Sequence, residues 1–428
     1  MRRVAFATLG CKLNQYETEL LREAFEARAY EAVPFDADAD VYVINTCTVT
    51  QRADRQSRQL VRRAARRANG STVVVTGCYA ELEPRIISAI PGVSAVVPNS
   101  RKLAVPRLIE SGFDERQNRL AGGIWPSSRR LTRFANHTRA FVKIQEGCDS
   151  SCAYCVIPRA RGTASSRPSD QIVEEISGLT ASGYGEIVLT GISIGRYRAP
   201  DGKDLSGLVR TILDRTGLRR IRISSVEPTD VTESLVALIA EEERVCPHLH
   251  LPLQSGDDQI LCRMKRPYRC ELYRQVVARL VARVPDIAIG ADVIVGFPGE
   301  GESEFSATYA FIDELPLAYL HVFPFSPRPG TPAASLDGQT SPQTRRERAD
   351  SLRQLGRVKT RQFRERFLGR AFRGLVESRR DRKTNLLIGL SGNYLKIRFD
   401  GPDELGGTFQ RVRITSLDAD GRVFGTRV

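Results

Sequence analysis

Three closely spaced cysteines are the residues of this chain best suited to metal chemistry. Cys148, Cys152 and Cys155, here called the loop cysteines, stand in the run GCDSSCAYCVIP. A structural zinc site and an electron-transfer 4Fe-4S cluster each take four protein ligands. Three thiolates at this spacing therefore predict a 4Fe-4S cluster with one iron open to a non-protein ligand. Unligated cysteines, or a zinc knuckle completed by a distant histidine, are the alternatives.

Three further cysteines each follow a short apolar run. Cys11 follows VAFATLG, Cys47 follows VYVINT and Cys78 follows TVVVTG; we call them the sheet-edge cysteines. Helical stretches at 18–28 and 53–69 separate these runs, which predicts a small parallel α/β sheet. Ligands bind at the carboxyl ends of parallel strands. The sheet-edge cysteines are therefore predicted to hold a second cluster with an open iron, with buried structural cysteines as the alternative.

The pattern of the chain predicts three domains and a linker. Residues 1–120 hold the small α/β region, and residues 121–137 form a linker rich in Gly, Ser and Arg. Residues 138–365 alternate between helix-like and strand-like segments, and residues 366–428 hold short alternating runs with glycine and aspartate turns. The last part predicts a small antiparallel β barrel.

The domain at 138–365 is predicted to be an open, partial (β/α)6 barrel. Its strand-like runs lie at 141–145, 186–190, 220–224, 248–253, 287–295 and 319–325. Barrel enzymes place their chemistry at the C-terminal ends of the strands. The loop cysteines follow the first of these runs, so they are expected at that end.

Polar residues and glycines follow several of the barrel strands. Gly191, Glu227 and Gln254 each come after such a run, and Asp292 precedes VIVGFPGE. Each could be a turn or cap residue, or could line a binding cavity.

Two histidines alternate along one predicted strand. His248 and His250 therefore share a face, which points either to the cavity or to the core. Cys246, Cys262 and Cys270 have no partner at ligand spacing and are interpreted as structural.

Basic residues give the chain a formal net charge of +14. Residues 345–383 hold fifteen Lys or Arg against five Asp or Glu. A strongly basic protein is attracted to polyanions, which indicates a nucleic acid partner. A solvated basic surface is the alternative.

The composition is that of a globular protein, with 41% apolar and 27% charged residues in a chain of 428. No apolar run approaches the roughly 20 residues that span a bilayer, and the start, MRRVAFATLG, has no signal-peptide core. The chain's nine cysteines are clustered, which suits metal ligation in a reducing compartment better than a disulfide framework. We therefore expect a cytoplasmic protein with no membrane partner.

Several motifs together resemble one known family. GCDSSCAYCVIPRARG, with Tyr154 in its aromatic position, resembles the cluster loop of radical S-adenosylmethionine (SAM) enzymes. The C-terminal β domain resembles TRAM, an RNA-binding module. With the sheet-edge cysteines, the chain resembles the radical SAM methylthiotransferases over nearly its whole length.

The resemblance implies SAM and two 4Fe-4S clusters as cofactors. SAM would bind the open iron of the cluster on the loop cysteines, and the open iron on the sheet-edge cysteines would carry sulfur. One SAM would methylate that sulfur, and a second would yield the radical that removes hydrogen from adenine C2. Residues implied for the SAM pocket are Tyr154, Gly191, Glu227 and Gln254.

The run TLGCKLNQYET, from Thr8 to Thr18, is similar to the branch that acts on N6-threonylcarbamoyladenosine beside the tRNA anticodon. The expected partners are tRNA rather than DNA, an electron donor of the flavodoxin or ferredoxin type, and a sulfur source. Other branches modify isopentenyladenosine in tRNA or an aspartate of a ribosomal protein. Outside the enzymes, the alternative is a zinc-dependent RNA-binding protein.

Overall fold

The computed structural model describes residues 1–68, 70–113, 131–135 and 137–428, which form two compact units. The first unit contains Met1–Ala135, Gln145–Ser150 and Cys155–Arg167, and the second contains Asn136–Ile144, Ser151–Tyr154 and Pro168–Val428. Of the predicted linker at 121–137, only 131–135 and 137 are among the described residues.

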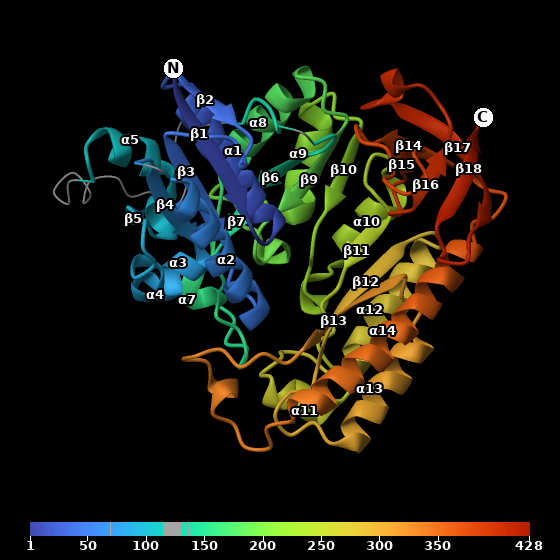
Figure 1. Ribbon diagram of the computed structural model, residues 1–428. Coiled ribbons are helices and arrows are strands. Elements are labelled where there is room, and N and C mark those ends of the chain that lie inside the picture. The colour runs from blue at the N-terminus through green and yellow to red at the C-terminus, as the bar shows by residue number, and fades with distance from the viewer. Residues whose placement is uncertain (69, 114–130, 136) are drawn as a thin grey trace. The chain divides into compact units, whose positions relative to one another are not determined.

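A five-stranded parallel sheet forms the centre of the first unit, as predicted (Figure 1). In spatial order its strands are β2 (Tyr30–Val33), β1 (Arg2–Thr8), β3 (Val41–Thr46), β4 (Thr72–Gly77) and β5 (Ala95–Val96). The three strands that precede the sheet-edge cysteines, β1, β3 and β4, are therefore direct neighbours. Their carboxyl ends lie at one edge of the sheet.

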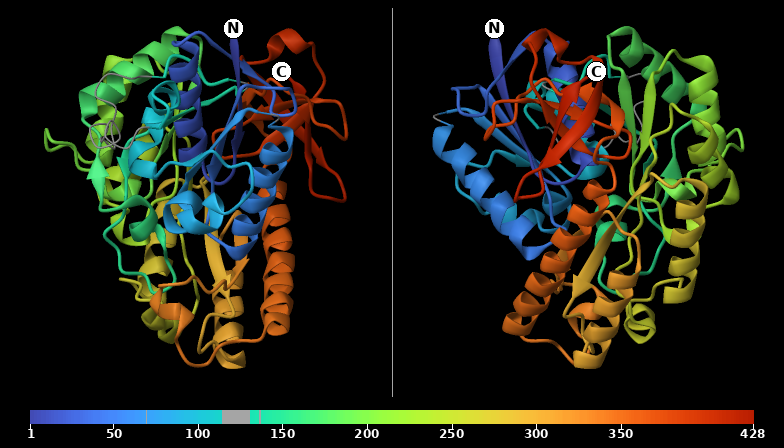
Figure 2. Two further views of the ribbon diagram at one scale, coloured as in Figure 1. Left: turned by 60° about the vertical axis from the view of Figure 1, so that its left-hand side comes forward. Right: turned by 90° about the vertical axis from the view of Figure 1, so that its right-hand side faces the viewer.

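Helices cover both faces of this sheet (Figure 2). Along β3, Val41 and Val43 join the cluster that contains Phe25, whereas Tyr42 and Ile44 join the cluster that contains Val61. Such burial on both faces is typical of parallel sheets. The helices of the unit are α1 (Lys12–Glu26), α2 (Gln51–Arg67), α3 (Cys78–Leu82), α4 (Pro84–Ser88), η1 (Asn99–Ala104), α5 (Val105–Glu110) and α7 (Ile157–Arg161). A two-stranded antiparallel ladder joins β7 (Gln145–Glu146) to β8 (Ser165–Ser166).

The first helix begins earlier than its predicted start at residue 18. Helix α1 starts at Lys12, with Cys11 as its N-cap residue. The Cys11 side chain makes no capping hydrogen bond, so the sequence carries no conventional start signal here. Instead, the side-chain amide of Asn14 donates to the carbonyl oxygens of Leu9 and Thr46 and ties the first turn to the sheet edge.

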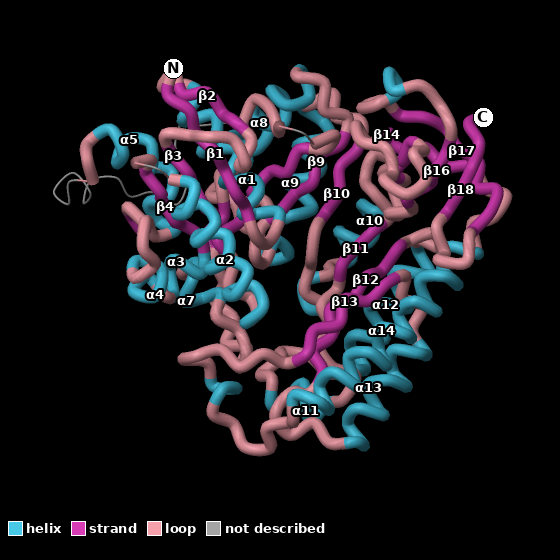
Figure 3. Tube along the Cα trace, in the orientation of Figure 1, coloured by secondary structure: helices cyan, strands magenta, loops and turns pink. Residues whose placement is uncertain are grey.

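Six parallel strands form the predicted open barrel in the second unit (Figure 3). They are β6 (Ala140–Lys143), β9 (Glu186–Thr190), β10 (Arg220–Ile223), β11 (His248–His250), β12 (Ala288–Val295) and β13 (Tyr319–Pro324). They pair as two sheets, β6-β9-β10 and β11-β12-β13. Single parallel bridges, Ile221 to Val245 and Ser225 to His250, connect the two sheets between β10 and β11.

Helices follow the strands on the outside of this half-barrel. They are α8 (Ser169–Ala181), η2 (Ile194–Arg196), α9 (Leu205–Arg215), η3 (Pro228–Asp230), α10 (Glu233–Glu241), α11 (Asp258–Arg263), α12 (Cys270–Arg283), α13 (Glu302–Glu314), η4 (Pro332–Ala334) and α14 (Pro342–Glu365). Within the described parts of the chain, no helix is both long and apolar enough to cross a bilayer.

The C-terminal part closes into the predicted small β barrel, and α14 leads into it (Figure 2). Its strands are β14 (Ala371–Val376), β15 (Leu387–Leu390), β16 (Lys396–Phe399), β17 (Phe409–Leu417) and β18 (Val423–Arg427), with η5 (Asp403–Leu405) before β17. Closure pairs β16 with β18 in parallel, while the other neighbours are antiparallel. Phe363 and Phe367 join the barrel core, which anchors the end of α14.

Candidate active site

The sheet-edge cysteines stand at the carboxyl ends of three neighbouring strands. Cys11 precedes α1, Cys47 follows β3, and Cys78 is the first residue of α3. Gly10 has a φ of +103°, and a Cβ atom there would lie 2.9 Å from Cβ and 3.0 Å from Sγ of Cys47. Only glycine allows this close approach, which brings the backbone beside Cys11 against Cys47.

The environment of Cys47 favours its protonated thiol. Burial raises the pKa of Cys47 to about 11, and negative charge on Cys78 and Cys11 raises it further. Without a cation, Cys47 therefore stays protonated at neutral pH, whereas metal ligation needs the thiolate.

The spacing of the sheet-edge thiols suits a cluster better than a single ion. In the described chain, the group of three potential ligand atoms within 4.8 Å of one another is His250, Asp292 and His321, so at least one pair of sheet-edge sulfurs lies farther apart than this limit. Thiolates on one tetrahedral zinc lie roughly 3.8 Å apart. Three thiol donors with at least one wide pair are compatible with ligation of an iron–sulfur cluster at separate corners.

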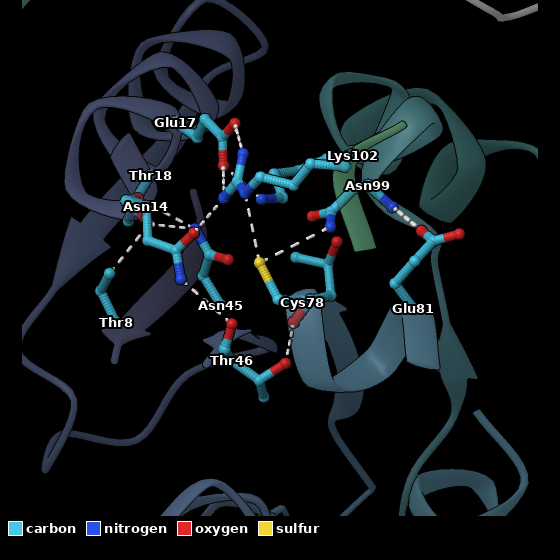
Figure 4. A network of polar contacts seen from close by, with 12 residues as sticks. Thr8, Asn14, Glu17, Thr18, Asn45, Thr46, Cys78, Glu81, Asn99 and Lys102 are labelled. Atoms are coloured by element: carbon cyan, nitrogen blue, oxygen red, sulfur yellow. Dashed lines mark hydrogen bonds and ion pairs between the residues drawn. The ribbon is translucent and has the colours of Figure 1, made fainter. Parts of the chain in front are cut away.

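A buried ionic network surrounds the sulfur of Cys78 (Figure 4). Arg161, the last residue of α7, donates from Nε to Sγ of Cys78 at 3.2 Å. Its Nη1 donates to Glu17 at 2.9 Å and to Glu146 at 2.8 Å, and its Nη2 donates to Asn14 at 2.5 Å. The Arg161 side chain is 1% exposed. Although burial lowers its pKa, the charges of Glu17, Cys78 and Glu146 hold the pKa well above its ordinary value.

Two further residues complete this network. Lys102 forms a buried ion pair with Glu17, and Asn99 donates to the carbonyl oxygen of Ala160 at 2.8 Å while its amide lies 3.9 Å from Sγ of Cys78. The cations Arg161 and Lys102 balance the carboxylates of Glu17 and Glu146 in charge. A buried, balanced network of this kind is rigid when each group is paired, so it can orient Cys78.

The loop cysteines lie in a segment without helix or strand. Cys148 and Cys155 belong to the first unit and Cys152 to the second, so their shared ligation stays a prediction from their spacing. Within the first unit, the amide of Ser150 lies 3.4 Å from Sγ of Cys148. Gly147, with a φ of +68°, lies so close to the Thr163 backbone that a side chain would clash there.

Arg266 links Cys152 with two of the residues predicted for the SAM pocket. Its Nη1 lies 3.2 Å from Sγ of Cys152 and 3.4 Å from the hydroxyl of Tyr154, and its Nη2 pairs with Glu227. Burial raises the pKa of Glu227, and the neighbouring Arg266 opposes that shift. Tyr154 also packs edge-to-face on Phe297. One cation thus organises the side chains around Cys152.

Gly191 and Gln254 stand where predicted, after β9 and β11. Gln254 has a φ of +67°, which is uncommon outside glycine. Its backbone amide donates to the carbonyl oxygen of Asp292 at 2.8 Å, and its carbonyl oxygen accepts from Ile294 at 2.9 Å. These two bonds hold the unusual backbone in place.

The sequence did not predict that Arg161 and Arg266 would contact the candidate cluster cysteines. The first stands in the run PRARG just after the loop cysteines, and the second follows Lys265 in a basic run, so the sequence offered only nearby positive charge as a signal. Each is paired with a cysteine more than eighty residues away in sequence, and only the folded chain reveals such a contact.

Comparison with known proteins identifies the family. Residues 3–98 match the uncharacterized protein family UPF0004, and residues 142–312 match the radical SAM superfamily. The chain is 39% identical over 425 residues to threonylcarbamoyladenosine tRNA methylthiotransferase MtaB of Bacillus subtilis (strain 168), covering 97% of this chain and 94% of that protein. This chain belongs to the radical SAM methylthiotransferase family. It is therefore a transferase that uses SAM and an iron–sulfur cluster.

Other members of the radical SAM methylthiotransferase family are similarly close. The protein of the same name from Aquifex aeolicus (strain VF5) is 39% identical, covering 94% of this chain and 98% of that protein. The tRNA-2-methylthio-N(6)-dimethylallyladenosine synthase of Sphingopyxis alaskensis is 35% identical, covering 96% of this chain and 94% of that protein.

Solved structures confirm the fold. The radical SAM methyltransferase TsrM from Kitasatospora setae, solved with cobalamin and a [4Fe-4S] cluster bound, superposes with a TM-score of 0.58. It is 17% identical and covers 78% of this chain and 77% of that chain. This likeness concerns the fold alone.

Proposed function

We propose that this enzyme adds a methylthio group to C2 of N6-threonylcarbamoyladenosine beside the anticodon of tRNA. The observation that carries the proposal is the similarity, over more than nine-tenths of the chain, to relatives named for that nucleoside. These relatives are 34–39% identical to it. The run TLGCKLNQYET around Cys11 supports the same branch.

Two clusters are part of the proposal. We assign one 4Fe-4S cluster to the loop cysteines and an auxiliary 4Fe-4S cluster to the sheet-edge cysteines. The placement of the sheet-edge cysteines at the carboxyl ends of three neighbouring parallel strands supports the second assignment. Such a cluster supplies the open iron that a sulfur donor requires.

The residues of the chain prepare these sites for radical chemistry. When bound, SAM and its cluster supply a radical able to remove hydrogen from a carbon that no acid–base group can activate. Arg266 holds Cys152 and Glu227 in position, and Glu227 offers a carboxylate to a bound amine or hydroxyl. The guanidinium of Arg161 holds its positive charge beside the sulfur of Cys78. Tyr154, Gly191 and Gln254 complete the proposed SAM pocket.

A basic groove supports RNA binding by the second unit. Arg353, Arg357, Arg361 and Arg364 lie three or four residues apart along α14 and line it, together with the turn between β17 and β18. Arginines on one helix face contact phosphates through several donors each. We propose that this groove and the C-terminal barrel hold the tRNA backbone.

The remaining partners follow from the chemistry. A radical SAM cluster must be reduced for each turnover, so we propose an electron donor of the flavodoxin or ferredoxin type. Each product also removes one sulfur, which requires a sulfur source. Because tRNA is the substrate, we place the enzyme in the cytoplasm.

The test is mass spectrometry of nucleosides from total tRNA of a strain that lacks this gene. We expect loss of the methylthiolated threonylcarbamoyladenosine, accumulation of its unthiolated parent, and recovery on complementation. Complementation with a Cys11→Ala variant is the matched control, because it should express without restoring product.

A second substrate is supported by relatives named for dimethylallyladenosine, at 34–35% identity. If the deletion strain loses the methylthiolated form of that nucleoside instead, this second assignment replaces the first. An unchanged tRNA profile, in a strain with no second enzyme of the family, excludes both and favours a ribosomal protein substrate.

A further inference from the structure

A cluster of rings around one carboxylate lies on three adjacent strands of the half-barrel. His250 comes from β11, Asp292 from β12 and His321 from β13. In the strand register, Asp292 is the direct partner of His321. Three of the chain's four histidines belong to this region, since His248 is on the same strand as His250.

The cluster faces the concave side of the half-barrel. On β12, Ile289, Ala291 and Val293 are completely buried, as expected for the face that the helices cover. Side chains alternate along a strand, so Asp292 points to the opposite face. Gln254, proposed for the SAM pocket, hydrogen-bonds through its backbone to Asp292, so the two residues are neighbours.

Both histidines are oriented by the same carboxylate oxygen. Nε2 of His250 lies 2.9 Å and Nδ1 of His321 lies 3.1 Å from Oδ1 of Asp292. The hydroxyl of Tyr319 lies 3.3 Å from the other ring nitrogen of His250. Burial raises the pKa of Asp292, but the hydrogen bonds and charge interactions with His250 and His321 lower it more. The pKa of Asp292 therefore lies well below its ordinary value. The carboxylate is therefore ionised, and both rings are held by donation to it.

This arrangement leaves groups available on the concave face. Within the described chain, Oδ2 of Asp292 and Nε2 of His321 make no hydrogen bond. The side chains of Asp292 and His321 are 27% and 55% exposed. Phe323, two residues farther along β13 and on the same face, is 39% exposed.

The rings form a stacked series that ends at the exposed member. The His250 and His321 rings are stacked with centroids 5.2 Å apart, and Tyr319 packs against both. An exposed ring supported from behind by other rings is a rigid surface for a flat ligand. Bases that are pulled out of RNA stack on such aromatic side chains, and their amino and hydroxyl groups need acceptors.

We propose that His250, Asp292 and His321 position the target nucleoside, with its base stacked on His321 and Phe323. The free oxygen of Asp292 accepts a hydrogen bond from an amino or hydroxyl group of that nucleoside. This inference rests on the proposed function, because it takes an RNA nucleoside as the ligand. A divalent metal ion is the rival occupant. A metal would have to displace the protons that both rings direct at Asp292.

The test compares reconstituted wild-type enzyme with His321→Ala, His321→Phe and Asp292→Asn on an anticodon stem-loop that contains threonylcarbamoyladenosine. The measurements are KM and kcat for the RNA, the SAM dissociation constant, iron content, and 5′-deoxyadenosine formed per product. Asp214→Asn is the matched control, because Asp214 is an exposed carboxylate on α9.

We expect His321→Ala to raise KM about tenfold, the range of one lost base–aromatic stack. His321→Phe should recover most of that loss, because it keeps a ring but no polar atom. Asp292→Asn should release more 5′-deoxyadenosine per product, since the nucleoside is held less well. SAM affinity and iron content should match those of wild type.

Other outcomes overturn the inference. If both His321→Ala and Asp292→Asn keep the wild-type KM and the wild-type ratio of 5′-deoxyadenosine to product, the cluster does not contact RNA. Weakened SAM binding would assign the cluster to the nucleoside part of SAM. Stoichiometric zinc or manganese in wild type that is lost in Asp292→Asn would make it a metal site. If wild type itself forms no product, the proposed function fails and this inference fails with it.

Discussion

The Nε atom of Arg161 lies 3.2 Å from the sulfur of Cys78, so a buried guanidinium donates directly to a proposed cluster ligand. The two residues are 83 positions apart in the chain. Hydrogen bonds and positive charge at a ligating sulfur favour the reduced cluster, and so raise its reduction potential. We therefore expect Arg161 to position a ligand of the proposed auxiliary cluster and to influence the reduction potential of that cluster.

Replacing Arg161 should change the auxiliary cluster without preventing SAM cleavage. Arg161→Gln should lower the reduction potential of that cluster and reduce product formation about tenfold, as for other partners of metal ligands. Arg161→Lys should recover little, because an ammonium cannot reproduce the guanidinium's contacts with Cys78, Glu17 and Asn14. Redox titration followed by electron paramagnetic resonance measures the effect. Arg159→Gln, on the exposed side of α7, is the control. Equal potentials in all variants would rule out this role.

Variants of the two cysteine sets should separate SAM cleavage from formation of the methylthiolated product. Alanine at any of the loop cysteines, Cys148, Cys152 or Cys155, should abolish SAM cleavage, because the cluster that reduces SAM is lost. Alanine at Cys11, Cys47 or Cys78 should leave measurable SAM cleavage but no methylthiolated product. Iron analysis should find about half of the wild-type iron in the variants of the second group. Full product formation by those variants would contradict the auxiliary cluster.

The buried carboxylate of Glu186 should contribute strongly to the stability of the second unit. Its oxygens accept from Arg222 at 2.9 Å and from Arg220 at 2.6 Å. These arginines also donate to the carbonyl oxygens of Leu390 and Ser391 in the C-terminal barrel. Removing the carboxylate leaves two buried cations without their main partner. Glu186→Gln should therefore lower the free energy of unfolding by about 3 kcal/mol.

The pH dependence of this effect has a definite sign. Although burial raises it, Arg222 and Arg220 hold the pKa of Glu186 at about 2, below its ordinary value. The contribution of Glu186 is therefore fully present above its ordinary pKa of 4.5 and is lost as the pH falls from there through about 2. Urea unfolding followed by circular dichroism should show wild type and Glu186→Gln converging over that range. Glu302→Gln, at a site 82% exposed, should behave as wild type at every pH.

The arginine face of α14 should supply part of the RNA affinity. Arg357 and Arg361 line the basic groove and are exposed. Replacing both with alanine should weaken tRNA binding and reduce the slope of log affinity against log salt by about 2, one for each lost phosphate contact. Fluorescence anisotropy at several salt concentrations measures this slope. The matched control is Arg274→Ala with Arg283→Ala on α12, which removes the same charge elsewhere. An equal loss in the control would indicate only a general effect of net charge.

The strand pattern and the order of the cysteines were readable from the sequence. Runs such as VYVINT and TVVVTG are apolar throughout, which marks strands buried on both faces, and each ends at a cysteine. Because the carboxyl ends of parallel strands meet at one edge, Cys11, Cys47 and Cys78 could be placed on neighbouring strand ends. The same reasoning predicted the six barrel strands, which the structure confirms.

Features that depend on how distant segments pack were not readable. The early start of α1 depends on Asn14 reaching the carbonyl oxygen of Thr46, and the parallel pairing of β16 with β18 depends on barrel closure. Local periodicity reports which face of an element is buried, but it does not report the partner across the interface. The sequence by itself determined the elements and the cysteine sets. Only the tertiary structure decided that Arg161 meets Cys78, that Arg266 meets Glu227, and that Asp292 joins two histidines, because these contacts join residues far apart in the chain.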